Sequence, residues 1–449
     1  YMINFTNTSG ASYIYLNQST FTNVTSGSIV YFQLNISSSS LSTINVTLNV
    51  TSINDATFKD SVSFKTTFLS AYQFSQNNVT SISVAPFGYD KAIIAWCDDT
   101  EDDITIAIFN TSGSLLQQPY DVDTTAGACT ANSVGYSVSV SAFDSNNFVI
   151  AWYDSVDSDI SFKILNSSLA NLTGDLDVDT NAGASATVST SAFNSTAFVV
   201  GWYDAASSDA TFRTYSVSGT AISAETDVDT DSGTTGNSVD VATINSTAFM
   251  FGWFDGGQND ASTITYSISG TALSPIFDVD GGAGTSESVS LSILNSSVAV
   301  FSWEDRGGGT PVNDASYVTM TTLSASISGT MDVDTNVGDT GRPVRVSSLS
   351  EDSFVFTWYD SSTDIGVSAQ TFLSNTTQIS SETVVQTTTQ AFQDVASEEF
   401  STGIQLCDNT FVIAISNSST TAFFRPYYQN GTIWPGICPT NIPQILNLT

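Results

Sequence analysis

The sequence predicts an all-β protein: a seven-bladed β-propeller of four-stranded antiparallel blades, preceded by a small β-sandwich-like domain. Three observations support this prediction. A repeat of about 50 residues runs through most of the chain, residues alternate within each repeat as in strands, and no stretch has a convincing helical period. A repeat of this length is typical of propellers and other repeat architectures, and the density of Ser, Gly and β-branched residues disfavours helices.

The most regular part of each repeat is an apolar run that ends in an aromatic pair and a carboxylate, as at 148–154 (FVIAWYD). Six copies contain a Trp, at spacings of 50 to 56 residues, and a downstream copy has Ile415 in its place. A run that is apolar at nearly every position predicts a strand covered on both faces. We therefore expect each Trp to lie in the core between neighbouring blades. The six tryptophans are Trp96, Trp152, Trp202, Trp253, Trp303 and Trp358.

The unit around Trp152 predicts four strands. They cover residues 134–143, 148–154, 160–165 and 176–179, with polar turns between them. Four antiparallel strands in about 50 residues are the unit of a propeller blade. A solenoid or a string of separate sandwiches is the competing interpretation, but a unit of this size is too small to be a stable sandwich alone. Seven units, the last one degenerate, favour a closed ring over residues 74–438, followed by a tail at 439–449.

Residues 1–73 do not share the repeat and predict a separate β-sandwich-like domain. Strand patterns occur at 29–34, 44–50 and 62–64, with Thr, Ser and Asn covering the other face. The segment 13–16 is open to two interpretations. It is the first strand of this domain, or it belongs to an arm within residues 1–20 that completes the sheet of a neighbouring subunit.

The charge composition restricts the possible partners. The chain has 9 Lys and Arg residues against 44 Asp and Glu residues, and no His. A net charge of −35 excludes nucleic acids and anionic membranes as partners, because both require a cationic surface. This charge is compatible with bound cations or with an acidic habitat. The lack of His removes the usual general base and the commonest zinc ligand.

Several features predict a secreted glycoprotein at the cell surface. The sequence begins with Tyr1 rather than Met, which we interpret as a processed N-terminus, and no apolar run reaches the length of a membrane span. Eighteen N-x-Ser/Thr sequons are present, seven of them in the first 50 residues, and N-linked glycans are the expected modification. The sequons begin at Asn4, Asn7, Asn17, Asn23, Asn35, Asn45, Asn49, Asn78, Asn110, Asn166, Asn171, Asn194, Asn245, Asn295, Asn375, Asn417, Asn430 and Asn447.

The four cysteines form two pairs by spacing. Cys97 and Cys129 lie 32 residues apart, Cys407 and Cys438 lie 31 apart, and each pair falls within one repeat length. In an extracellular protein this spacing predicts two local disulfides, while four cysteines allow three pairings in all. A metal site at these cysteines is disfavoured because the chain has no C-x-x-C motif and no His.

The repeat resembles that of known surface proteins. The pattern V-x-V-x-x-F…F-V-I-A-W-Y-D…D-I-S-F…D-V-D-T, here within residues 138–180, resembles repeats of large bacterial and archaeal surface proteins that are similar to seven-bladed propellers. The low Lys and Arg content and the dense sequons resemble archaeal cell-envelope glycoproteins, which include S-layer-associated proteins and surface-filament subunits. The resemblance covers about four-fifths of the chain. It implies a fold but little about function, because propellers serve enzymes, lectins and scaffolds.

A second repeated motif, Asp-Val-Asp, is a candidate calcium site. Alternate carboxylates followed by a turn glycine are typical of calcium loops. The spacing departs from the EF-hand pattern, because Gly comes at position seven and no Glu stands at position twelve. The alternative is structural: an outer strand with Val buried and both Asp residues facing water, followed by an Asx-type turn. The candidate Ca²⁺ ligands are Asp177, Asp179, Asp227, Asp229 and Asp231.

A third motif, Trp-Tyr-Asp-x4-Asp, flanks the turn between the second and third strands, as at Asp154 and Asp159. We expect these carboxylates to accept backbone hydrogen bonds in the turn. A residue repeated in every blade is poor evidence for catalysis, so the positions at which the blades differ are more informative. They include an insertion at 306–313 and the arginines Arg342 and Arg345. No Glu/Tyr motif accompanies these arginines, and we predict that the protein is not an enzyme.

Together these observations predict a secreted, N-glycosylated structural subunit of an extracellular filament or cell-envelope layer. Its partners would be copies of itself, joined through contacts between the N-terminal domain and the propeller, because head-to-tail contacts of this kind produce open assemblies. The cofactor considered is Ca²⁺. The alternative is a surface adhesin or lectin that binds glycans on one face of the propeller.

Overall fold

The computed structural model is all-β and divides into two units, Tyr1–Tyr72 with Pro435–Thr449, and Gln73–Trp434. In the part of the chain that the structure describes, no helix is long and apolar enough to cross a membrane. The structure describes residues 2–7, 13–16, 34–37, 42–51, 59–68, 72–75, 79–88, 91–98, 101, 103–110, 115–123, 137–154, 158–179, 187–204, 207–229, 238–256, 260–279, 288–305, 314–333, 340–360, 366–387, 392–399, 410–417 and 422–428.

In the first unit, the described residues form two small antiparallel sheets. One contains β1 (Met2–Asn7), β4 (Ser42–Thr51) and β5 (Lys59–Phe68), with β4 in the middle. The other pairs β2 (Tyr13–Leu16) with β3 (Leu34–Ser37). The strands predicted at 44–50 and 62–64 lie within β4 and β5, and most of the strand predicted at 29–34 is outside the described residues. Exchange of the segment 13–16 between subunits stays a prediction.

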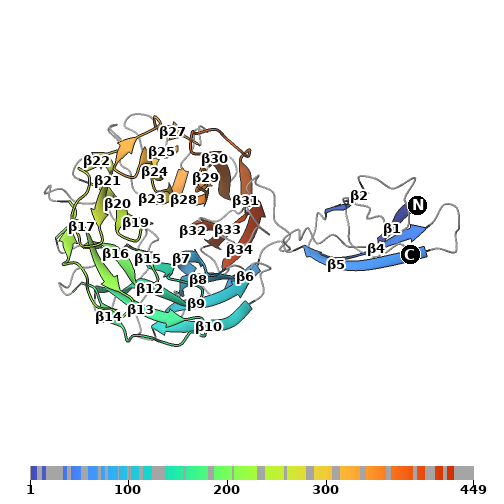
Figure 1. Ribbon diagram of the computed structural model, residues 1–449, viewed down its shortest axis with the longest axis horizontal. Helices are drawn as coiled ribbons and strands as arrows, with labels where there is room; N and C mark the ends of the chain where they lie inside the picture. Colours follow the sequence, from blue (N-terminus) through green and yellow to red (C-terminus); the bar gives the residue numbers. More distant parts are fainter. Residues whose placement is uncertain are drawn as a thin grey trace. The chain divides into compact units, whose positions relative to one another are not determined.

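In the second unit, six sheets share one plan, in which consecutive antiparallel strands follow one another outward from the axis (Figure 1). We number these blades 1 to 6 in chain order. Their strands are β7 (Val79–Pro86), β8 (Lys91–Asp98), β9 (Asp103–Asn110) and β10 (Leu115–Asp123); β11 (Val138–Ala142), β12 (Asn147–Asp154), β13 (Asp159–Asn166) and β14 (Leu176–Asp177); β15 (Val188–Asn194), β16 (Ala197–Asp204), β17 (Asp209–Ser216) and β18 (Thr226–Asp227); β19 (Val239–Asn245), β20 (Ala248–Asp255), β21 (Asp260–Ser267) and β22 (Phe277–Asp278); β23 (Val289–Asn295), β24 (Val298–Asp305), β25 (Asp314–Thr321), β26 (Ala325–Ser326) and β27 (Met331–Asp332); and β28 (Thr340–Ser350), β29 (Ser353–Asp360), β30 (Gly366–Leu373) and β31 (Thr383–Thr387).

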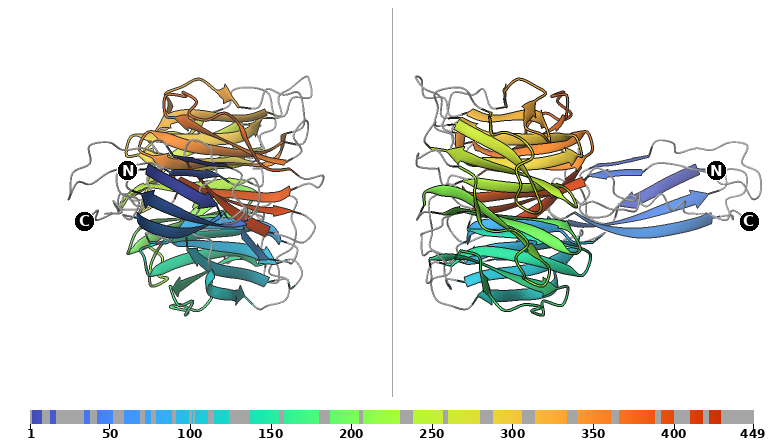
Figure 2. Two further views of the ribbon diagram at one scale, coloured as in Figure 1. Left: turned by 90° about the vertical axis from the view of Figure 1, so that its right-hand side faces the viewer. Right: turned by 60° about the vertical axis from the view of Figure 1, so that its left-hand side comes forward.

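Six blades, not the predicted seven, follow this plan of consecutive strands. At the position of the seventh predicted unit, the described chain supplies three strands, β32 (Phe392–Glu399), β33 (Thr410–Asn417) and β34 (Ala422–Tyr428). The fourth strand of their sheet is β6 (Tyr72–Ser75), which precedes blade 1 in the sequence. The prediction assumed that every sheet is built from consecutive strands. Here hydrogen bonds join the two ends of the propeller segment instead, and β32 packs against both β28 and β7 (Figure 2).

The second strand of each blade lies in the core. β12, β16 and β20 are buried at nearly every position, which confirms the prediction of a strand covered on both faces. The six repeated tryptophans are each at most 2% exposed. Each one from blade 2 onward packs on the preceding blade; Trp202, for example, shares a cluster with Phe162 and Val178 of blade 2. The predicted position of the Trp residues between blades is therefore confirmed.

Side-chain size is matched across the interfaces between blades. Gly201 of blade 3 lies against Phe251 of blade 4, and Gly252 of blade 4 lies against Phe301 of blade 5. A Cβ atom at Gly252 would stand 2.4 Å from a ring carbon of Phe301, which a close-packed interior does not allow. The glycine before Trp in these two blades therefore leaves room for the aromatic ring of the next blade.

Serine side chains satisfy the free edges of the inner strands. Each inner strand pairs with the second strand of its own blade on one edge only, and unpaired backbone N–H groups on the other edge would be costly. Backbone N–H groups of one blade donate instead to hydroxyls of the preceding blade. The bonds run from Val140 N to Ser83 Oγ (3.1 Å), from Thr190 N to Ser139 Oγ (3.0 Å) and from Val241 N to Ser189 Oγ (3.2 Å).

Candidate ligand-binding cavity

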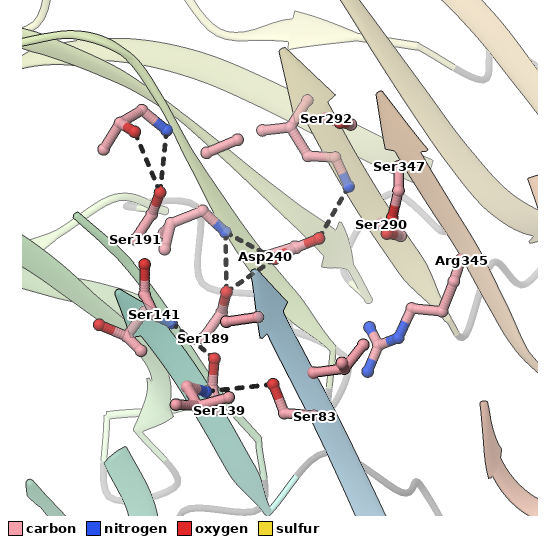
Figure 3. Close-up of a pocket in the computed structure, with 18 of the residues that line it drawn as sticks. Ser83, Ser139, Ser141, Ser189, Ser191, Asp240, Ser290, Ser292, Arg345 and Ser347 are labelled. Carbon is pink, nitrogen blue, oxygen red and sulfur yellow. Dashed lines mark hydrogen bonds between the residues drawn. The ribbon is translucent and has the colours of Figure 1, made fainter. Parts of the chain in front are cut away.

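A cavity of about 330 Å³ lies on the axis of the propeller. In the described part of the chain its walls are the inner strands β7, β11, β15, β19, β23 and β28 (Figure 3). Serine and threonine hydroxyls and short apolar side chains dominate these walls. The volume is at the lower end of the range for small-molecule sites, about 300–1,000 Å³. The cavity therefore suits a solute of about the size of a monosaccharide.

One position of the inner strand breaks the repeat. In each blade it stands opposite the residue that precedes the Trp of the second strand. Four of the six blades have Ser at this position, whereas blade 4 has Asp240 and blade 6 has Arg345. Both of these side chains line the cavity (Figure 3). The full set is Ser83, Ser139, Ser189, Asp240, Ser290 and Arg345.

Three of the four serines at this position still have a hydroxyl hydrogen to donate. Ser83, Ser139 and Ser290 each accept an N–H bond from the following blade. A hydroxyl that accepts one bond keeps its O–H hydrogen for another partner. The wall of the cavity therefore offers hydrogen-bond donors to a bound solute.

Asp240 is held by three donors. Its Oδ1 accepts from Ser189 Oγ (2.7 Å) and from Val241 N (2.9 Å), and its Oδ2 accepts from Leu291 N (2.8 Å). Burial raises the pKa of the Asp240 carboxyl, while the charge of Arg345 and these hydrogen bonds lower it. The carboxylate thus takes over the role that serine hydroxyls have in other blades, and it links the inner strands of blades 3, 4 and 5.

Arg345 brings a guanidinium group to the cavity from β28 (Figure 3). Its side chain is half-buried, and its charge acts on the Asp240 carboxyl. Among the described lining residues, Asp240 is the one carboxylate and Arg345 the one cation. Glycoside hydrolysis by the usual route requires a pair of carboxylates. The described lining residues supply one carboxylate rather than a pair, and the absence of enzyme activity stays a prediction.

Sequence reasoning identified Arg345 but missed Asp240. The second predicted arginine, Arg342, has a side chain outside the described set. Asp240 is one of 44 acidic residues, so composition does not distinguish it. An alignment of the repeats on their Trp residues would have done so, because Asp240 stands thirteen residues before Trp253, at a position where four other blades have Ser.

The first Asp of each Asp-Val-Asp motif has a structural partner. It lies on the outer strand and is exposed, as the structural alternative expected. A hydroxyl from the third strand of the same blade donates to its Oδ1. The bonds are Thr105 to Asp121 (3.3 Å), Ser161 to Asp177 (3.4 Å), Thr211 to Asp227 (3.3 Å), Ser262 to Asp278 (3.2 Å) and Ser316 to Asp332 (3.0 Å).

In the copies where the structure describes it, the second Asp of the motif is buried between blades. Asp179 is 0% exposed and Asp229 is 3% exposed, so the expectation that both carboxylates face water is wrong for this residue. The chain after the outer strand packs against the following blade, whose Trp lies next to it. At the first interface, Trp152 Nε1 donates to Asp123 Oδ2 (3.1 Å). The motif therefore contributes to the contact between blades.

Of the predicted calcium ligands, Asp179 lies in a cluster of three carboxylates. Its oxygen and those of Asp204 and Glu225 lie within 4.8 Å of one another. Burial, followed by repulsion from Asp179, raises the pKa of Glu225, and the positive charge of Arg213 lowers it. The cluster thus has a cation of the protein beside it, and calcium binding stays a prediction. Asp177 and Asp227 have the hydroxyl partners given above, Asp229 lies between blades 3 and 4, and Asp231 is outside the described residues.

The carboxylates of the Trp-Tyr-Asp-x4-Asp motif face one another across a hairpin, as Asp154 faces Asp159. Two examples show bonds to the turn. Asp98 Oδ1 accepts from Glu101 N (3.3 Å), and Asp204 Oδ2 accepts from Ser207 Oγ (3.0 Å). These bonds agree with a role in the turn, although the donor at Asp204 is a hydroxyl rather than a backbone N–H.

The predicted covalent features lie mostly on turns or outside the described residues. Cys97 is buried in β8, while Cys129, Cys407 and Cys438 are outside the described residues, so both disulfides stay predictions. Several sequons form turns in which the Asn side chain accepts bonds from the residue two positions on. Asn194 Oδ1, for example, accepts from Thr196 N (2.7 Å) and Thr196 Oγ1 (2.6 Å). Turn formation explains these triplets without a glycan, and glycosylation stays a prediction.

No protein-family model matches the chain, and no curated protein matches it. Solved structures do match. The BP39L lectin from Burkholderia pseudomallei is 11% identical with a TM-score of 0.55, over 81% of this chain and 99% of the lectin chain. The WD40 domain of Toxoplasma gondii coronin is 9% identical with a TM-score of 0.49, over 81% and 87%. A Hadza microbial sialidase, Hz136, is 9% identical with a TM-score of 0.44, over 90% and 76%. At these identities the likeness shows the β-propeller fold alone.

Proposed function

We propose that this protein is a solute-binding propeller, a lectin-like module that holds a small hydroxylated ligand in its axial cavity. One observation carries the proposal: the ring of serines on the inner strands is broken by Asp240 and Arg345, and both face the same cavity. A ring with a purely structural role needs only its hydroxyls, since these already satisfy the free N–H groups of the next blade. Charged groups on a concave polar wall are typical of a binding site.

The likeness to a lectin propeller is compatible with this function. The alternative predicted from the sequence, an adhesin or lectin, therefore agrees better with the described residues than a filament or envelope subunit does. We also propose that the sheet of β32, β33, β34 and β6 completes the ring as a seventh blade. An extracellular location with N-linked glycans belongs to the same proposal, since the sequons motivate it.

The experiment compares the protein with a double variant, Asp240→Ser/Arg345→Ser, which gives blades 4 and 6 the residue present in the other four. Binding of neutral, acidic and amino monosaccharides is measured by isothermal titration calorimetry. We expect at least one of these sugars to bind the parent protein and the double variant to lose that binding. The control variant Glu351→Ser changes an exposed turn residue away from the cavity and should bind as the parent does.

The thermal unfolding temperature of the double variant separates lost binding from lost structure. We expect it to stay close to that of the parent, because serine at these positions is already compatible with the fold. A double variant that folds and binds as well as the parent would overturn the proposal, as would a parent protein that binds none of the sugars.

A further inference from the structure

We infer that one face of the propeller carries N-linked glycans and that Asn194 and Asn245 are attachment sites on it. This inference rests on the extracellular location proposed above and specifies where the modification lies. Three observations lead to it. The sequons of the blades share one face, the turns at Asn194 and Asn245 do not require an asparagine amide, and the amide nitrogen of these two residues has no hydrogen-bond partner among the described residues.

The seven sequons that begin within blades 1 to 6 lie at the same end of the strands. In each blade the second strand begins where the first and third strands end. Thr190 N and Ala192 N of blade 3 donate to two serines of blade 2 in the same order along the strand, so neighbouring inner strands run in the same direction. Each sequon asparagine ends a first or third strand or lies just after a third strand, and all of them therefore share one face. They are Asn110, Asn166, Asn171, Asn194, Asn245, Asn295 and Asn375.

The opposite face of these blades has asparagines in its chain segments but no sequons. The segments between the second and third strands contain Asn259 and Asn313, and each is followed by Asp-Ala, which does not complete a sequon. Paired carboxylates flank these segments, as in blades 2 and 3. The sequons of Asn78 and Asn417 begin outside the six blades. Blades 1 to 6 therefore place their sequons on one face and their paired carboxylates on the other.

The turn between the first and second strands requires an acceptor oxygen but not an amide. Asn194 Oδ1 accepts from the N–H (2.7 Å) and the hydroxyl (2.6 Å) of the Thr two positions on. Asn245 Oδ1 accepts from the same two groups, both at 2.9 Å. In blade 2 the equivalent residue is Asp144, whose Oδ1 accepts from the N–H groups two and three positions on, at 2.6 and 2.9 Å. A carboxylate thus forms the same turn, and Asn adds a group that the turn does not use.

The added group is the amide nitrogen Nδ2. Among the described residues, Nδ2 of Asn194 and of Asn245 has no hydrogen-bond partner. Both turns are accessible, because the two residues after each Asn are exposed. Asn295 stands at the equivalent position of blade 5, but its Nδ2 donates to the Glu351 carbonyl of blade 6 (2.7 Å). We therefore expect Asn194 and Asn245 to carry a glycan more often than Asn295 does.

The modification joins Nδ2 to the anomeric carbon of a sugar. Nδ2 gives up one proton to a base of the transferase and forms the new bond to this carbon. The bond between the anomeric carbon and a phosphate oxygen of the donor breaks, and the phosphate leaves. The donor is a lipid-linked glycosyl phosphate, and the transferase is one that recognises N-x-Ser/Thr. Since a glycan is bulky and solubilising, the face that carries it is directed to solvent.

Glycopeptide mass spectrometry of the full chain from its natural source tests the inference. We expect glycans at Asn194 and Asn245 in most copies of the chain and a lower occupancy at Asn295. Glycans at other sequons, with Asn194 and Asn245 unmodified, would overturn the inference, as would a higher occupancy at Asn295 than at both. A chain without any glycan would overturn it together with the proposed location. The proposed binding of a solute in the cavity would then still stand, because calorimetry tests it separately.

A gain of glycosylation in blade 2 is the second test. The double variant Asp144→Asn/Asn146→Thr gives this turn the Asn-Ser-Thr triplet of blades 3 and 4, whereas Asp144→Asn alone creates no sequon. Both variants and the parent are expressed as full chains in a secreting host that glycosylates N-x-Ser/Thr. The double variant should gain the mass of one glycan, and the single variant should gain none.

Thermal unfolding after enzymatic removal of the glycans checks that the double variant folds. Its unfolding temperature should match that of the parent treated in the same way, because the turn keeps its acceptor oxygen. A folded double variant that gains no glycan would overturn the inference that this turn, on this face, is an attachment site.

Discussion

The interface between blades 2 and 3 and the interface between blades 3 and 4 have the same backbone plan but differ in charge. Each buries the second Asp of an Asp-Val-Asp motif and the Asp that follows Trp-Tyr or Trp-Phe. At the first of these interfaces, the third strand adds Arg213 and the chain leading into the outer strand adds Glu225. At the second, the corresponding residues are Ile264 and Ile276. Two charged residues at the first interface therefore correspond to two isoleucines at the second, at equivalent positions of the strands.

The interface between blades 1 and 2 extends the comparison. It has Lys163 at the position of Arg213 and Asp175 at the position of Glu225, with Lys163 Nζ 2.7 Å from Asp175 Oδ1. At these two positions, a cation and a carboxylate therefore occur together at two interfaces. Both are absent at the interface between blades 3 and 4. Lys163 is buried, with a side chain only 7% exposed, and a buried cation is stable only when it is compensated. The comparison indicates that the additional carboxylate is a partner of the cation rather than one half of a metal site.

The largest expected effect follows from breaking one half of such a pair. Arg213→Ile removes the positive charge beside Asp179, Asp204 and Glu225, together with its contact over the Tyr215 ring at 5.7 Å. We expect the free energy of unfolding to fall by about 2 kcal/mol, a value reduced from that of a fully buried pair because Arg213 is half-buried. Urea unfolding at pH 7 measures this change.

The double variant Arg213→Ile/Glu225→Ile is the matched control. It places isoleucine at both positions, as blade 4 has with Ile264 and Ile276. Most of the free energy of unfolding lost in Arg213→Ile should therefore return. A double variant that is less stable than Arg213→Ile alone would contradict the argument that the pair is exchanged as a unit.

The next effect concerns the tryptophans. Trp152 Nε1 donates to Asp123, whereas the buried Nε1 atoms of Trp253 and Trp303 have no hydrogen-bond partner among the described residues. Trp152→Phe should therefore destabilise the protein by about 1 kcal/mol more than Trp253→Phe does, which is the typical value of one hydrogen bond. Denaturant midpoints of the variants give the comparison, with Trp303→Phe expected to match Trp253→Phe. Equal losses in Trp152→Phe and Trp253→Phe would show that the bond to Asp123 contributes nothing.

The fold was predictable from the sequence because it is repeated. One period of about 50 residues contains the alternation of β11 and the continuous burial of β12, and six copies of Trp make the period visible. The exception is the sheet that β6 joins. Four residues at 72–75 carry no mark of the repeat, so a contact between segments more than 340 residues apart could not be read from the pattern.

The site was less predictable because it depends on differences between copies. Asp240 and Arg345 lie 105 residues apart in sequence and meet only because the ring closes. The burial of Asp179 was missed for a related reason. Alternation along one strand predicts which face a side chain occupies, but it does not show that the next blade covers that face.

Calcium gives a third test of the comparison. The parent protein holds Arg213 beside the carboxylates of Asp179, Asp204 and Glu225, while Arg213→Ile leaves three carboxylates whose oxygens could coordinate a hard cation. We expect millimolar calcium to raise the thermal unfolding temperature of Arg213→Ile by a few degrees more than that of the parent protein. A chelator should reverse the difference. An equal rise in both proteins would point to calcium sites elsewhere, including those predicted at the Asp-Val-Asp motifs.

The smallest effect concerns pH and blade 1, where Glu101, Asp103 and Asp121 have oxygens within 4.8 Å of one another. Burial, followed by repulsion from Asp121, Glu101 and other carboxylates, raises the pKa of Asp103 from 3.8 to about 6. The folded protein thus binds this proton more tightly than the unfolded chain does. The stability that it contributes is fully present below pH 3.8 and is lost as the pH rises through about 6. Asp103→Asn should therefore raise the thermal unfolding temperature at pH 7 but not at pH 3.5.

The control variant for this pH test is Glu351→Gln, which removes one charge from an exposed turn and accounts for the general relief of net charge. The difference between the two variants should grow across the window from about pH 4 to pH 7, because that is the range in which Asp103 loses its proton in the folded protein. If the thermal unfolding temperatures of both variants changed with pH in the same way, the carboxylates around Asp103 would act only through net charge. Local compensation of charge would then matter for the charged pairs of blades 2 and 3, and not for the exposed turn of blade 1.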